Sequence, residues 1–294
     1  MSDLVKDFLR AGRFTPTASY QRFAYACGAL LVLSGAFHGA VYLVDGGPWQ
    51  GPVSWRKPIV FGLSFGITLL TVTWIMTFLR PRKSTGWIVL GVLAVASLGE
   101  VFLISMQKWR GVASHFNEDT AFDESVFSMM GLLVALVALI TVFVVVRSFF
   151  PMDAPASLAW AIRAGLVLML VSQAVGVQMI VEEGNTFGTA GALKVPHAFT
   201  LHAVQVLPAL ALVLSLSNST ERHRLNVVAL GAAGYAGLIA STMVQTYDGR
   251  GPLDLGLLAA ALALVGLAML AASALVALQG LRTRPRPSTH VSAR

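Results

Sequence analysis

Residues 99–111 read GEVFLISMQKWRG, so an apolar run gives way to a dense polar cluster within about four turns of a helix. Glu100 lies inside that run, which together with the residues before it is long enough to cross a bilayer. Glu100, Gln107 and Arg110 are seven and three residues apart and therefore share one stripe of the helix. Because ionisable side chains in membrane segments usually face protein or water, the stretch predicts a membrane helix with a functional polar face.

The composition of the whole chain is that of a polytopic membrane protein. Of its 294 residues, 56% are hydrophobic and 12% are charged, about half the charged share of soluble proteins. The apolar residues occur in blocks of about twenty, the length that a membrane-spanning helix needs. These blocks predict an all-α bundle of eight transmembrane helices at roughly 22–44, 58–79, 86–107, 125–147, 157–181, 196–216, 226–247 and 253–280.

The net charge of +7 reflects membrane topology and not a nucleic-acid partner. Lys and Arg are concentrated at the N-terminus, in alternate loops and in the C-terminal tail, and the chain has no aromatic and basic patch of the nucleic-acid-binding kind. The positive-inside rule then predicts a plasma (inner) membrane protein with both termini in the cytoplasm. The single cysteine, Cys27, excludes an intrachain disulfide and a cysteine-rich metal site.

We expect one membrane domain over 22–280, preceded by a cytoplasmic or interfacial segment over 1–21 and followed by a disordered cytoplasmic tail over 281–294. A shift of 138 residues lays Gln107 and its neighbours, QKWRG, over Gln245 and its neighbours, QTYDG. The match predicts an internal repeat with halves of about 22–147 and 157–280. Because each half has an even number of spans, the halves keep one orientation, and the repeat is a parallel 4+4 duplication.

Polar side chains within the spans are concentrated toward the outer, extracytoplasmic end. His38, Glu100 and His202 each lie six or seven residues from that end, roughly 10 Å deep at the helical rise per residue. Two imidazoles and one carboxylate on three helices are the ligands of catalytic zinc and of non-haem iron sites. We therefore expect a Zn or Fe ion on these three residues. Groups that would orient its ligands or the substrate are Tyr42, Gln107, Gln205 and Gln245.

Three residues are candidates for catalysis: Glu100, Arg110 and His115. His115 is a possible general base in the loop over 114–117, although no nucleophile–base spacing is visible in the sequence. Structural alternatives remain for Glu100, for His38 and for the loop that contains His115. Glu100 would form an ion pair with Arg110 or Lys57, His38 would form a helix–helix hydrogen bond, and the loop would be an ordinary solvated loop and not a lid.

The one-sided distribution of polar residues favours a membrane-embedded enzyme, metal-assisted or redox, that acts on a small or lipophilic ligand from the extracytoplasmic side. Two alternatives belong to other classes. In the first, His38 and His202 bind haem b from opposite faces, or the protein binds a quinone. In the second, the repeat serves alternating access in a small-solute transporter or a membrane sensor, for which the cytoplasmic halves of the spans lack a polar route.

Overall fold

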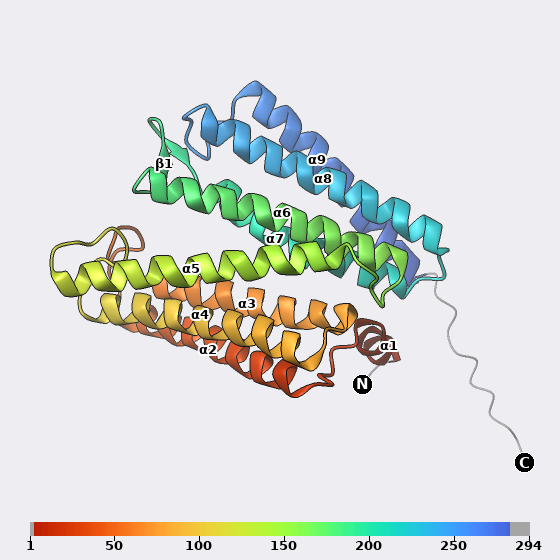
Figure 1. Cartoon of the computed structure of the whole chain (residues 1–294). Helices are drawn as coiled ribbons and strands as arrows, with labels where there is room; N and C mark the ends of the chain where they lie inside the picture. The colour runs from red at the N-terminus through yellow and green to blue at the C-terminus, as the bar shows by residue number, and fades with distance from the viewer. Residues whose placement is uncertain (1–2, 283–294) are drawn as a thin grey trace, which may run out of the picture. The chain divides into compact units, whose positions relative to one another are not determined.

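The computed structural model describes residues 3–282 and consists almost entirely of helices (Figure 1). Within these residues, eight helices are long and apolar enough to cross a membrane, so the chain is a multi-pass membrane protein with an all-α fold. The eight are α2 (Ser19–Asp45), α3 (Arg56–Leu79), α4 (Lys83–Trp109), α5 (Ala121–Ser148), α6 (Ala156–Val181), α7 (Lys194–Ser215), α8 (Glu221–Tyr247) and α9 (Leu257–Arg282). The predicted number and order of membrane helices are confirmed.

Two short elements accompany the membrane helices. Helix α1 (Asp3–Gly12) lies in the N-terminal segment, 1–21, that was predicted to be cytoplasmic or interfacial. Strands β1 (Thr186–Phe187) and β2 (Gly191–Ala192) form an antiparallel hairpin between α6 and α7 that the sequence did not predict. Most of the tail predicted to be disordered, 281–294, lies outside the described residues.

The chain forms two compact units. The N-terminal unit is Arg13–Asp153 and contains α2 to α5, and the C-terminal unit contains α1 and α6 to α9. Each unit therefore contributes four long helices in sequence order. The parallel duplication itself stays a prediction.

Within the N-terminal unit, α2 and α3 approach each other backbone to backbone. A Cβ atom added to Gly62 would lie 2.8 Å from the backbone nitrogen of Gly35, and one added to Gly66 would lie 2.9 Å from the carbonyl oxygen of Gly28. Small residues at one-turn spacing permit such close packing of membrane helices, where dispersion contacts replace the hydrophobic effect as the attraction. These close approaches hold α2 against α3.

The connection from α4 to α5 covers residues 110–120 and ends at a capped helix start. Thr120 is the N-cap of α5, and its hydroxyl oxygen accepts a hydrogen bond of 3.1 Å from the backbone N–H of Asp123. Asp123 and Glu124 lie in the first turn of α5, where carboxylates favour the positive end of the helix dipole. These interactions hold the end of the loop that leads into α5.

Candidate functional site

Glu100 is a buried carboxylate in the C-terminal half of α4. Its side chain is 1% exposed, and neither carboxylate oxygen has a hydrogen-bond partner among residues 3–282. One turn earlier on the same helix, the Ser97 hydroxyl is also buried without a partner in the described part of the chain. A buried polar group without hydrogen bonds costs free energy, and in a membrane helix such a residue is a candidate for function.

The loop after α4 brings His115 to Glu100. The Nε2 atom of His115 lies 4.0 Å from Oε1 of Glu100, and its Nδ1 atom lies 2.9 Å from the Oγ atom of Ser114. Lys57, in the first turn of α3, donates a hydrogen bond of 3.4 Å from Nζ to the same Ser114 oxygen. These four side chains form a continuous polar cluster, Lys57–Ser114–His115–Glu100, which we call the Glu100 cluster.

The environment of His115 keeps its imidazole neutral. Burial lowers the pKa of His115 to about 4, and the positive charge of Lys57 acts in the same direction. A neutral imidazole has one N–H donor and one acceptor nitrogen. In the tautomer in which the Ser114 hydroxyl donates to Nδ1, the ring proton is on Nε2, facing Glu100.

The segment that carries Ser114 and His115 is packed inward and is not an ordinary solvated loop. Ser114 and Asn117 are both buried. The Asn117 amide donates 2.9 Å to the carbonyl of Ala113, and its oxygen accepts 3.2 Å from the backbone N–H of Asp119. Phe116 has φ +53°, a left-handed conformation that is uncommon for an aromatic residue and that turns the chain directly after His115.

Gln107 and Arg110 belong to a separate network that joins α4 to α5. Asp123 Oδ1 accepts 2.8 Å from the Gln107 amide and 2.6 Å from Arg110 Nη1, and its Oδ2 accepts 2.6 Å from the Thr120 hydroxyl. Arg110 Nη1 also donates to the Gln107 side-chain oxygen. The ion pair of Arg110 is therefore with Asp123, and Glu100 has neither of the two ion-pair partners that the sequence suggested for it.

His38 lies on α2 in an aromatic cluster. Its Nδ1 donates 2.8 Å to the carbonyl of Ser34, and its Nε2 accepts 3.2 Å from the indole N–H of Trp109 on α4. The Trp55 ring lies 5.0 Å from the Trp109 ring, and the Lys108 ammonium lies 4.1 Å from the Trp55 ring centroid. Both ring nitrogens of His38 are thus engaged in hydrogen bonds, one of which links two helices.

The remaining predicted site residues lie on three helices. Tyr42, one turn beyond His38 on α2, packs on Trp49 with ring centroids 5.2 Å apart. His202 and Gln205 lie on α7 in the C-terminal unit, where His202 is exposed and Gln205 is half-buried.

Gln245, near the end of α8, closes the loop to α9. Its amide nitrogen donates 2.7 Å to the carbonyl of Gly251 and also donates to the carbonyl of Asp254, and its oxygen accepts 3.1 Å from the N–H of Gly256. Gln107 and Gln245, which the sequence offset pairs, therefore both bind the segment that follows their own helix.

Residues 3–282 contain no group of three or more His, Cys, Asp and Glu side chains arranged to hold a metal ion. Glu100 and His115 are two such groups, 4.0 Å apart. The Zn or Fe site on His38, Glu100 and His202, and the haem b site on the two histidines, stay predictions.

Two members of the Glu100 cluster, Ser114 and Lys57, were not identified as site residues from the sequence. Ser114 directly precedes His115 in the chain, and adjacent residues give none of the spacings by which a nucleophile and its base are usually found.

Comparisons of the chain with protein-family models, with curated proteins and with solved structures give no match.

Proposed function

We propose that this multi-pass membrane protein is an enzyme that transfers the acyl group of a small or lipophilic ester, with Ser114 as the nucleophile. One observation carries the proposal: the two nitrogens of His115 face a hydroxyl at 2.9 Å and a carboxylate oxygen at 4.0 Å. A hydroxyl, an imidazole and a carboxylate in this order are the parts of a nucleophilic triad, which is recognised by geometry and not by sequence position.

Each residue would have a distinct role. The Ser114 oxygen attacks the ester carbonyl and forms the new C–O bond, while its proton moves to Nδ1 of His115. His115 then gives that proton to the departing alcohol oxygen as the ester C–O bond breaks, which leaves an acyl-serine for water to hydrolyse. Glu100 stabilises the imidazolium that exists between the two proton transfers, and the Lys57 ammonium stabilises negative charge on the Ser114 oxygen.

The surroundings of the cluster support a lipophilic substrate. Ser114 is 2% exposed and the side chain of His115 is 25% exposed, so the imidazole is the more accessible of the two groups. Toward the other end of α4, the buried residues from Val89 to Ala96 are apolar. A polar cluster at one end of a unit and an apolar interior beyond it favour an enzyme over a transporter, and the positive-inside rule assigns this end to the extracytoplasmic face.

A fluorophosphonate probe tests the proposal without knowledge of the substrate, because it phosphonylates activated serines and spares ordinary ones. The purified full-length protein in detergent should be labelled, the Ser114→Ala variant should not, and His115→Gln and Glu100→Gln should be labelled at least about tenfold more slowly. Ser105→Ala is the matched control, since Ser105 lies on the same end of α4 and is half-buried. Equal labelling of wild type and Ser114→Ala, or no labelling of folded wild type, would refute the acyl-transfer proposal.

A metal-assisted reaction is the second candidate, and the free carboxylate oxygens of Glu100 favour it. Metal–ligand distances of about 2.1 Å place two tetrahedral ligand atoms about 3.4 Å apart. Glu100 Oε1 and His115 Nε2 are 4.0 Å apart, and a small movement of either side chain would bring the two atoms to that ligand–ligand separation. In this case Glu100→Gln and His115→Gln would lose zinc measured by elemental analysis after zinc loading, whereas Ser114→Ala would keep it.

A further inference from the structure

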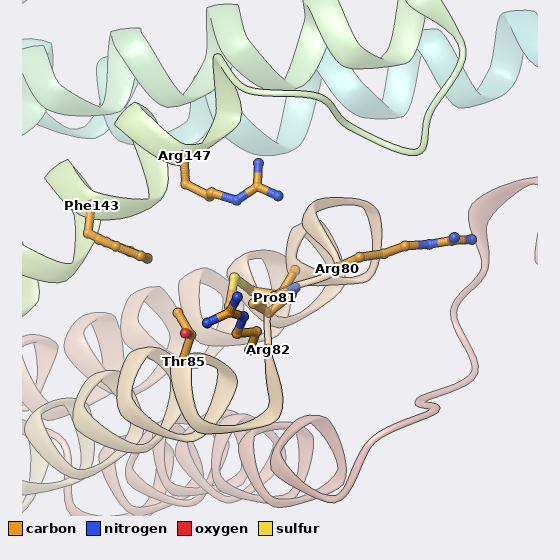
Figure 2. Close-up of a pocket in the computed structure, with 7 residues that line it drawn as sticks. Arg80, Pro81, Arg82, Thr85, Phe143 and Arg147 are labelled. Carbon is orange, nitrogen blue, oxygen red and sulfur yellow. The ribbon is translucent and has the colours of Figure 1, made fainter.

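A basic cavity of about 310 Å³ lies at the opposite end of the N-terminal unit from Glu100 (Figure 2). It is formed where α3 ends, α4 begins and α5 ends, and its walls are Met76, Arg80, Pro81, Arg82, Thr85, Phe143 and Arg147. All seven residues belong to one compact unit. The cavity takes no part in the chemistry proposed for the Glu100 cluster.

The positive charge in this cavity is only partly neutralised. Arg147 donates from Nη2 to the carbonyl of Leu79 at 2.7 Å and from Nη1 to the carbonyl of Pro151 at 3.3 Å. Both acceptors are neutral, so they hold the guanidinium in place and leave its charge and its other N–H donors available. Arg147 is thus a fixed cation on the cavity wall.

Arg82 is a second cation without a counterion. Its guanidinium makes no hydrogen bond or ion pair with any side chain or carbonyl in the described range 3–282. The nearby carboxylate of Asp153 already binds Arg80 and Arg13. Figure 2 shows Arg82 and Arg147 on two sides of the cavity, whereas the side chain of Arg80 extends away from it.

The first turn of α4 adds to the preference for an anion. The helix begins at Lys83 with no side-chain cap and no acidic residue in its first turn, and Thr85 from this turn lines the cavity. The first N–H groups of a helix lack partners within it and lie at the positive end of its dipole, where they favour anions. Two guanidinium groups, a hydroxyl and a helix start therefore surround one space.

We infer that this cavity binds a phosphate group, and that the phosphate is the headgroup of an anionic membrane lipid. Arg guanidinium groups bind phosphate oxygens through paired, charge-assisted hydrogen bonds. The cavity lies at the ends of three membrane-spanning helices, which is the depth of lipid headgroups, and Met76 and exposed Phe143 supply an apolar wall for the attached chains. A free phosphate ester presents the same oxygens without the chains.

Thermal shift of the purified full-length protein in detergent distinguishes these sources. Phosphatidylglycerol should raise Tm in a saturable manner more than phosphatidylcholine does, which supports the lipid headgroup. Stabilisation by inorganic phosphate alone, equal to that by phosphatidylglycerol, would support the phosphate site and assign it to a soluble anion. Absence of a preference for either over phosphatidylcholine would overturn the inference.

Substitutions in and beside the cavity test whether phosphatidylglycerol binds there. Arg82→Gln removes a guanidinium with no described partner, so it should fold normally and bind phosphatidylglycerol at least about tenfold more weakly. The control is Lys83→Gln, which removes the same charge from the next residue, outside the cavity, and should bind as wild type does. Thr85→Glu, which adds a carboxylate to the cavity wall, is a second test and should abolish binding. Equal weakening by Arg82→Gln and Lys83→Gln would show diffuse attraction and refute a defined site.

Discussion

Acidification should destabilise the folded protein through one loop residue, His115. Burial and the charge of Lys57 lower its pKa from the ordinary 6.5 to about 4. Between these two values the unfolded chain binds a proton that the folded chain does not, so stability is full above about pH 6.5 and declines as the pH falls toward 4.

The size of the effect follows from the two pKa values. At pH 5 the unfolded imidazole is almost fully protonated and the folded one is about one-tenth protonated, which gives about 2 kcal/mol of lost stability relative to pH 8. For a protein of this size, that loss lowers Tm by roughly 5 °C. His115→Gln has no proton to bind at this position and should lack this part of the pH dependence.

The assay is thermal unfolding of both proteins in detergent at pH 8, 6.5, 5.5 and 5, followed by tryptophan fluorescence. The difference in Tm between wild type and His115→Gln cancels the contributions of other titrating groups. Identical pH dependence in the two proteins would show that His115 is exposed to solvent. A wild type that gains stability on acidification would show an imidazolium paired with the Glu100 carboxylate, and would refute the environment described for this ring.

Further predictions concern helix packing, the ion pairs of Asp153, and bound metal ions or haem. Gly62→Ala should destabilise the protein by about 1–3 kcal/mol because its Cβ would lie 2.8 Å from the backbone of Gly35, whereas Gly39→Ala, with open space around its Cβ, should be nearly neutral in the same thermal assay. Arg13 and Arg80 hold the pKa of Asp153 below its usual range. Asp153→Asn should therefore lower Tm at neutral pH, and the difference in Tm from wild type should disappear as the pH falls through the lowered pKa. A difference in Tm that is constant at all pH values would contradict the ion pairs. Elemental analysis and a visible spectrum of the purified protein test the predicted Zn or Fe ion and haem b, and ion or haem content that is unchanged in His38→Ala and His202→Ala would exclude the sites predicted on these histidines.

The fold could be predicted from the sequence because a single physical rule governs it. A membrane helix needs a long apolar run, and the described residues contain eight of these. The second span, predicted at 58–79, therefore differs little from the observed helix Arg56–Leu79. The last span was predicted to begin at 253, whereas α9 begins at Leu257. Leu253 and Leu255 extend the apolar signal into a loop, and hydropathy does not distinguish an apolar loop residue from a helical one.

The candidate site was only partly predictable because its geometry depends on loop structure and on distant partners. Glu100 was found from the sequence, since a carboxylate in an apolar run is conspicuous. The hydrogen bond from Trp109 to His38 joins residues 71 apart, and the pairing of Arg110 with Asp123 depends on the course of the loop between them. Helical spacing describes one helix at a time and carries no information about such contacts.

The most direct test of the account is the rate of fluorophosphonate labelling of wild type, Ser114→Ala and Glu100→Gln, with the labelled residue identified by peptide mass spectrometry. We predict one labelled serine, Ser114, whose labelling is lost in Ser114→Ala and slowed in Glu100→Gln. Modification at another serine, or a rate that does not change in Glu100→Gln, would contradict a catalytic role for the Glu100 cluster.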